Sequence, residues 1–85
     1  MSTYQILFSK RAQKDVEQLN AKLKAKLKNI LLNVVAQNPY EGKALKGDLI
    51  GLRSLRLNRK DRVLYEIIET DKVVLIIRAK THYGE

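Results

Sequence analysis

The chain has 85 residues, of which 45% are apolar, so its composition excludes a disordered chain and predicts one compact domain. It has no cysteine and only one histidine, so disulfides and thiolate metal sites are excluded. No apolar run comes near the ~18–20 residues that cross a bilayer, which excludes a membrane span. The sequence also has no secretion-signal pattern, so we expect a cytoplasmic protein that carries no metal or other cofactor. Seventeen Lys and Arg against nine Asp and Glu give a net charge of +8, which favours a polyanionic partner over a merely well-solvated surface without deciding between them.

The first half of the chain predicts a strand followed by a helical hairpin. Residues 4–9 are rich in β-forming side chains and are predicted as the strand. Ser9 is placed to cap a helix over 10–19, and Asn20 is placed to cap a second helix over 21–37. In both helices the apolar residues recur at helical spacing, so each has one face suited to a core.

The second half predicts a loop and three strands. Asn38-Pro39 ends the second helix, because the residue before proline avoids the helical region. Residues 40–51 hold three of the four glycines and are predicted as a loop. Strands are expected over 52–58, 62–68 and 73–80, with turn-forming residues between them.

This order, β-α-α-β-β-β, predicts an α+β fold with a small, mainly antiparallel sheet and both helices on one face. In the second and third strands the apolar residues have odd numbers, whereas Arg56 and Arg62 have even numbers. If the turn holds three residues, so that Asn58 opposes Arg62, both arginines lie on the face away from the helices. A two-residue turn would separate them. The last strand is apolar on both faces, so its orientation stays open.

Positive charge is concentrated in residues 43–62, where only two acidic residues occur. Arginine can bind phosphate oxygens through two parallel hydrogen bonds, and a sheet can gather such side chains on one face. The alternative is a charged, solvent-facing sheet that resists edge-to-edge aggregation. The cations are Lys43, Lys46, Arg53, Arg56, Arg59, Lys60 and Arg62.

The chain ends on further chemistry-bearing residues. Lys80 precedes the only histidine, His82, and a tyrosine, Tyr83. An imidazole can act as a general acid or base near neutral pH, and a tyrosine can stack on a base or donate a hydrogen bond. The alternative for residues this close to the end is a frayed, solvated segment.

Several short motifs stand in order along nearly the whole chain. They are Tyr-Gln-Ile-Leu-Phe-Ser-Lys-Arg-Ala-Gln-Lys-Asp at 4–15, Asn-Pro-Tyr-Glu-Gly-Lys at 38–43, Leu-Lys-Gly-Asp-Leu-Ile-Gly at 45–51, Arg-Leu at 56–57, Asp-Arg-Val-Leu-Tyr at 61–65 and Thr-His-Tyr at 81–83. Their order and spacing resemble the RelE/YoeB superfamily of bacterial toxins.

The resemblance implies a toxin of a toxin–antitoxin module. Such toxins are ribonucleases that cut messenger RNA, mostly in the ribosomal A site, and a cognate antitoxin holds them inactive. Matching positions implies that Arg56 and Arg62 bind the scissile phosphate, that His82 is the general acid and that Tyr83 is the terminal tyrosine. The neighbouring cations Lys43, Lys46, Arg53, Arg59 and Lys80 are then expected to bind the RNA backbone.

One position departs from the family pattern. The YoeB branch has a glutamate, its general base, where this chain has Lys43, and Glu41 stands two residues earlier. The base is therefore either Glu41 or a neutral lysine such as Lys43 or Lys46. The RelE branch works without this glutamate and relies on basic residues.

Two other functions remain open. ParE-like toxins share the fold but poison DNA gyrase, and they usually lack the catalytic C-terminal residues, so the ending at His82 and Tyr83 favours the nuclease. A non-catalytic nucleic-acid-binding domain would explain the charge alone. It predicts salt-dependent binding that leaves the nucleic acid intact.

Overall fold

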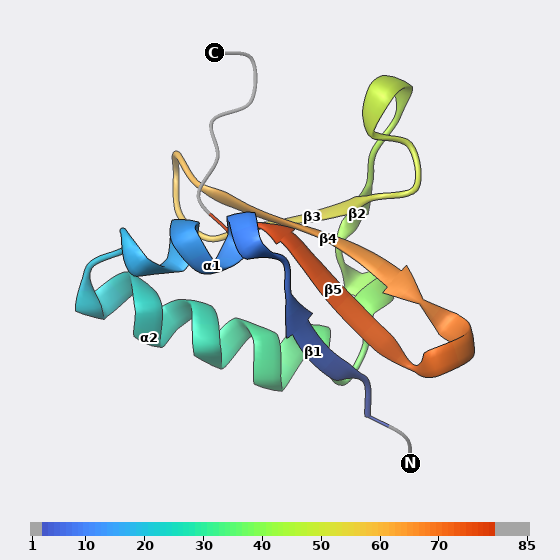
Figure 1. Cartoon of the computed structure of the whole chain (residues 1–85), viewed down its shortest axis with the longest axis horizontal. Coiled ribbons are helices and arrows are strands. Elements are labelled where there is room, and N and C mark those ends of the chain that lie inside the picture. The colour runs from blue at the N-terminus through green and yellow to red at the C-terminus, as the bar shows by residue number, and fades with distance from the viewer. Residues whose placement is uncertain (1–2, 80–85) are drawn as a thin grey trace.

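The computed structural model describes residues 3–79, which form two helices and a five-stranded sheet (Figure 1). Within this range, no helix combines the length and the apolar character needed to cross a bilayer. The predicted α+β class is confirmed. In chain order the elements are β1 (Gln5–Phe8), α1 (Lys10–Glu17), α2 (Ala21–Ile30), β2 (Lys43–Ala44), β3 (Arg53–Arg56), β4 (Arg62–Ile68) and β5 (Val73–Arg78).

Both helices begin at the predicted capping residues. The Ser9 Oγ accepts a hydrogen bond from the Ala12 N–H at 3.0 Å, and the Asn20 Oδ1 accepts one from the Leu23 N–H at 2.8 Å. Each side chain satisfies a backbone donor that the first helical turn leaves without an intrahelical partner. Helix α2 continues through a π-helical turn, η1 (Leu31–Val35), and so ends slightly before the predicted residue 37.

The strand order in the sheet is β1-β5-β4-β3-β2. Neighbouring strands are antiparallel except for β1 and β5, which run parallel, so the first and last strands of the chain lie side by side. Helices α1 and α2 cover the same face of this mixed sheet, as predicted (Figure 1). Among residues 3–79, no α-helix covers the opposite face. Below we call it the open face.

The core lies between the helices and the covered face of the sheet. On β4 the odd-numbered side chains Val63 and Tyr65 are buried in it, as the alternation predicted. On β5 the even-numbered Val74 and Ile76 are fully buried, which settles the orientation that the sequence left open. The helices contribute Ala12, Leu19, Leu27, Leu31 and Val35 to the same cluster.

The prediction of a loop over residues 40–51 is wrong in part. This segment contains strand β2, whose Lys43 pairs with Ser54 and whose Ala44 pairs with Arg53 of β3. A strand of two residues has no periodicity of its own, because it exists only through hydrogen bonds to a partner. The rest of the segment includes the tight turns η2 (Pro39–Glu41) and η3 (Gly47–Leu49).

The β3–β4 hairpin keeps the predicted parity but not the predicted register. Arg56, rather than Asn58, lies opposite Arg62, and residues 57–61 form the turn. The Asn58 Oδ1 accepts hydrogen bonds from the Lys60 and Asp61 N–H groups at 2.8 and 2.6 Å. Because these hydrogen bonds make Asn58 part of the turn, Asn58 does not pair with β4, and β3 is shorter than expected.

Tyr65 ties the start of the β2 segment to the sheet. Its hydroxyl donates to the Pro39 carbonyl oxygen at 2.6 Å and accepts from the Gly42 N–H at 3.1 Å. A Cβ atom at position 42 would lie 2.1 Å from this hydroxyl oxygen, so only glycine fits. The buried hydroxyl therefore determines how the chain enters β2.

We expect Tyr65→Phe to lower the free energy of unfolding by about 1–3 kcal/mol, because it leaves the buried Pro39 carbonyl and Gly42 N–H without their partner. Urea unfolding followed by circular dichroism measures the loss. Tyr4→Phe is the matched control, since it removes a more exposed hydroxyl that binds Glu69. Equal losses in the two variants would contradict this role for Tyr65.

Candidate functional site

Two arginines face each other on the open face of the sheet. Arg56 at the end of β3 lies directly opposite Arg62 at the start of β4. Their neighbours Leu57 and Val63 point into the core, so alternation places both guanidinium groups on the open face. Like charges directly opposite one another cost stability, and an anion bound between them would relieve that cost. The pair is thus suited to bind a phosphate.

Lys43 belongs to the same face. It is opposite Ser54 in the β2–β3 ladder, and Ser54 stands two residues before Arg56 on β3. Residues two apart along a strand point to the same side. The Lys43 side chain is exposed, so the open face presents it together with the arginine pair.

Strand β5 ends beside this arginine pair. Arg78, its last residue, is opposite Leu64, which stands two residues after Arg62 on the neighbouring strand. From here the chain continues to residues 80–85, so the predicted site residues Lys80, His82 and Tyr83 lie outside the described residues. These three residues follow the end of β5 in the sequence.

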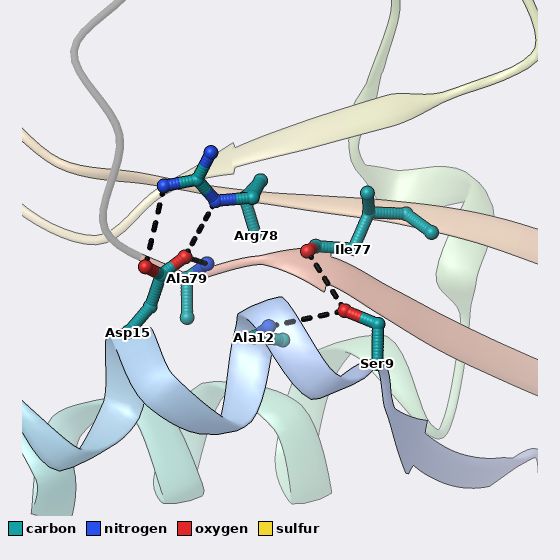
Figure 2. Close-up of polar contacts among 6 residues, drawn as sticks. All are labelled: Ser9, Ala12, Asp15, Ile77, Arg78 and Ala79. Atoms are coloured by element: carbon teal, nitrogen blue, oxygen red, sulfur yellow. Dashed lines mark hydrogen bonds and ion pairs between the residues drawn. The ribbon is translucent and has the colours of Figure 1, made fainter.

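A carboxylate on α1 holds the end of β5. The Asp15 Oδ2 accepts hydrogen bonds from the Arg78 Nε at 2.7 Å and from the Ala79 N–H at 3.1 Å, as Figure 2 shows. The ion pair raises the pKa of Arg78 above its usual value. Sequence reasoning missed this residue. The available signal was an acidic side chain beside the apolar stripe of α1, between Ala12 and Val16.

Two other predicted RNA-binding residues lie on loops. Arg59 is exposed in the turn that joins β3 to β4, next to the arginine pair. Lys46 is exposed just before η3, in the loop between β2 and β3 that projects from the sheet (Figure 1). Neither side chain is buried, so both are accessible to a partner.

Arg53 and Glu41 lie elsewhere. The Arg53 Nη1 donates to the Gly42 carbonyl oxygen at 2.7 Å, and its guanidinium carbon lies 5.0 Å from the centre of the Tyr40 ring. Its strand partner is Tyr65, on the covered face. Burial raises the pKa of Tyr65, and the nearby charge of Glu41 adds to this rise. The structure thus groups Arg53 with Tyr65, and Glu41 is the exposed last residue of the turn η2.

The other end of the sheet carries a cluster around Glu69. This carboxylate accepts hydrogen bonds from the hydroxyls of Tyr4 and Tyr40 at 2.9 and 2.5 Å, and forms an ion pair with Lys72 at 2.6 Å. Lys72 and the two tyrosines lower the pKa of Glu69 to about 2. The cluster joins the segment before β1 to the β4–β5 turn. It is remote in the sheet from the arginine pair, which lies where β4 begins.

Within residues 3–79, no group of three or more His, Asp or Glu side chains is arranged to hold a metal ion. The open face presents the cations Arg56, Arg62 and Lys43. Guanidinium and ammonium groups can bind a phosphodiester and stabilise added negative charge on it.

Residues 6–84 match the family described as ParE-like toxin of type II bacterial toxin-antitoxin system. This chain belongs to that family. The curated relative Toxin YoeB of Synechocystis is 36% identical over 70 residues, which cover 78% of this chain and 79% of the relative. The resemblance to RelE/YoeB toxins that the motifs indicated is confirmed.

Solved toxin structures share the fold. The toxin–antitoxin complex RelBE2 of Mycobacterium tuberculosis contains a chain that matches with a TM-score of 0.86 and 27% identity, over 100% of this toxin and 97% of that chain. In the intact RelBE complex of Escherichia coli the values are 0.76 and 26%, over 92% and 95%. In a YoeB–YefM complex of Staphylococcus aureus they are 0.69 and 28%, over 94% and 98%. All three were crystallised as complexes with antitoxins.

The pKa of Glu69 predicts an acid-sensitive contribution to the toxin's stability. Because the folded-state pKa of about 2 is below the ordinary value of 4.5, the stabilisation is present above pH 4.5 and is lost as the pH falls toward 2. We expect the free energy of unfolding to fall more steeply over this range in wild type than in Glu69→Gln. Urea unfolding at several pH values measures both slopes.

Glu66→Gln controls for the loss of one negative charge, since Glu66 is an exposed carboxylate of β4 outside the Glu69 cluster. Its acid profile should follow that of wild type. Parallel profiles for wild type and Glu69→Gln would show that the cluster makes no such contribution.

Proposed function

We propose that this toxin is a metal-independent endoribonuclease that cleaves messenger RNA in the ribosomal A site. The observation that carries the proposal is the direct pairing of Arg56 with Arg62 on the open face, beside the end of β5. Similarity to a protein named YoeB and to RelE structures supports it. The resemblance of the sequence motifs to RelE/YoeB toxins also implies cleavage of messenger RNA.

The reaction needs no nucleophile from the protein, because RNA carries its own. The 2′-hydroxyl oxygen attacks the adjacent phosphorus and loses its proton to a base. The bond from phosphorus to the 5′-oxygen breaks, and that oxygen takes a proton from an acid. The products are a 2′,3′-cyclic phosphate and a 5′-hydroxyl. The enzyme aligns these groups, moves two protons and stabilises the pentacoordinate phosphorane.

Each proposed role follows from side-chain chemistry. Arg56 and Arg62 bind the non-bridging phosphate oxygens and stabilise the additional negative charge of the transition state. His82, in its protonated form, donates a proton to the leaving 5′-oxygen, and Tyr83 stacks on or hydrogen-bonds to the RNA next to it. Each positioned acid or base contributes about 10²–10⁴ in rate.

For the base we propose Lys43 rather than Glu41. Lys43 is exposed on the open face together with the arginine pair, whereas Glu41 belongs to the turn η2, which the Tyr65 hydroxyl holds through Pro39 and Gly42. In its neutral form the Lys43 amine can take the proton of the 2′-hydroxyl. Arg59, Lys46 and Lys80 are proposed contacts to flanking phosphates. We propose a supporting role for Arg53, which holds the Gly42 carbonyl at the start of β2.

We propose that the cognate antitoxin binds a groove of about 320 Å³ between α2 and β1. Its lining is mostly apolar, including Phe8, Leu27 and the half-exposed Leu32, and it also contains Lys24 and Lys28. An amphipathic segment with acidic residues at its edge fits both features. The toxins of RelBE2, RelBE and YoeB–YefM were crystallised with antitoxins, which supports an antitoxin as the occupant.

A second candidate function is poisoning of DNA gyrase, favoured by the family's description as ParE-like. It would use the same basic surface to bind a protein or DNA, without a general acid. The presence of His82 and Tyr83 in the sequence favours the nuclease.

We expect Arg56→Ala and Arg62→Ala each to lower the rate of cleavage about 10²–10³-fold, because each removes a group that stabilises the transition state. The assay uses ribosomes programmed with a defined message and maps the 5′ ends of the products. Lys26→Ala is the matched control, since it removes an exposed cation from α2. Its activity should equal that of wild type.

Wild-type protein should leave 5′-hydroxyl ends under these conditions, with or without a metal chelator. Gyrase-dependent DNA breaks with intact RNA would replace the proposal by the second candidate. Salt-dependent binding of RNA without cleavage would leave only a nucleic-acid-binding domain.

We expect Leu32→Glu to weaken antitoxin binding at least tenfold, because it puts a negative charge into an apolar contact. Leu32 is 51% exposed, so the toxin itself should fold normally. Calorimetry with the antitoxin encoded beside the toxin gene measures the affinity. Asn33→Glu adds the same charge on the next exposed residue, outside the groove lining, and should bind as wild type does. Equal binding by both variants would indicate that the antitoxin binds another surface of the toxin.

A further inference from the structure

We propose that Asp15 is a positioning residue for catalysis, because it fixes the backbone from which the chain continues to His82. The inference rests on the proposed nuclease function. Asp15 itself lies on α1, on the side of the sheet opposite the arginine pair, so it is not expected to touch RNA. It acts through the end of β5.

The contacts of Asp15 are those of an anchor. The residue is only 8% exposed, and its two carboxylate oxygens accept from the Arg78 Nε and Nη2 at 2.7 and 3.3 Å. The Oδ2 also accepts from the Ala79 N–H at 3.1 Å, as Figure 2 shows. A buried carboxylate must have such partners, because burial without them is costly. The carboxylate thus holds both a side chain and the backbone at the end of the strand.

The end of β5 is irregular where this anchor acts. Tyr65 pairs with Ile76 but the preceding Leu64 pairs with Arg78, so the register shifts by a bulge. Bulges bend a strand and redirect the residues that follow. The Ser9 hydroxyl donates to the carbonyl oxygen of the bulged residue Ile77 at 3.0 Å. Helix α1 therefore holds the bulge through Ser9 and holds the residues after it through Asp15 (Figure 2).

The position of Ala79 in the sequence explains why this anchor affects catalysis. Ala79 is fully buried, and only two residues separate it from His82. Three residues of extended chain span at most about 10 Å, so a shift of Ala79 changes where the imidazole can reach. A misplacement of about 1 Å in a catalytic group can cost about 100-fold in rate.

The ion pair with Arg78 does not by itself account for an acid at this position. Asp15 lies beside the apolar stripe of α1, between Ala12 and Val16, and a buried ion pair can often be replaced by apolar residues at no cost in stability. An apolar side chain would pack there but could not bind the Ala79 N–H. The carboxylate is the group that holds the strand end at one point.

The test compares wild type with Asp15→Asn, Asp15→Leu and the control Glu17→Gln. Glu17→Gln changes a carboxylate to an amide at an exposed position of the same helix and leaves the Ala79 contact in place. We expect both Asp15 variants to lower kcat about 10–100-fold with KM within about twofold, whereas Glu17→Gln keeps the kcat of wild type. Ribosome-dependent cleavage of a defined message gives both constants.

Amide hydrogen exchange provides a measurement that needs no activity. In wild type the Ala79 amide should exchange at least tenfold more slowly than an unprotected amide, and this protection should disappear in Asp15→Leu. An unprotected Ala79 amide in wild type would overturn the inference, even if an Asp15 variant failed to fold.

A double-mutant cycle then tests the route through the histidine. In a His82→Ala background, Asp15→Asn should cause no further loss of kcat, because the group that it positions is already absent. Additive losses would contradict positioning. If wild type cleaves RNA and both Asp15 variants keep its kcat, the inference is wrong and the proposed function stands. If wild type cleaves no RNA, the proposed function fails, and the exchange data alone decide whether Asp15 anchors the strand.

Discussion

Burial of one face of the β3–β4 hairpin against the helices is the constraint on which the rest of this toxin depends. Leu57, Val63 and Tyr65 are almost completely inaccessible to solvent. Since side chains alternate along a strand, burying these residues forces Arg56 and Arg62 onto the open face. The hydrophobic effect thus assembles a pair of like charges that electrostatics alone would separate. The core determines the position of the charges.

The two ends of the sheet have different roles. At one end, Glu69 joins Tyr4 and Tyr40 to the β4–β5 turn through neutral and ionic hydrogen bonds. At the other end, the arginine pair lies beside the last residues of β5. The Glu69 contacts hold the fold, whereas the arginine pair presents positive charge on the open face. Tyr65 lies between these regions and connects the β2 segment to the sheet.

Helix α1 does more than pack against the sheet. Its N-cap residue Ser9 also donates to the Ile77 carbonyl, and Asp15 accepts from the Ala79 N–H, so one helix holds the last strand on both sides of its bulge. The parallel pairing of β1 with β5 brings these two parts of the chain together. The start of the chain thereby holds the end of strand β5 in place.

The sequence by itself determined the features that depend on local chemistry. Capping by Ser9 and Asn20, the end of the helices near Pro39 and the alternation of β4 all follow from side chains a few residues apart. The motif order was also sufficient to indicate the toxin family, because it is a property of the chain and not of its folding.

Only the tertiary structure decided which of the charged residues act together. Strand β2 and the exact pairing of Arg56 with Arg62 arise from hydrogen bonds between segments, and neither has a periodic signature. The contact of Asp15 with Ala79 across 64 positions depends on how distant elements pack. Local sequence carries no record of such distances, because they are fixed only when the core closes.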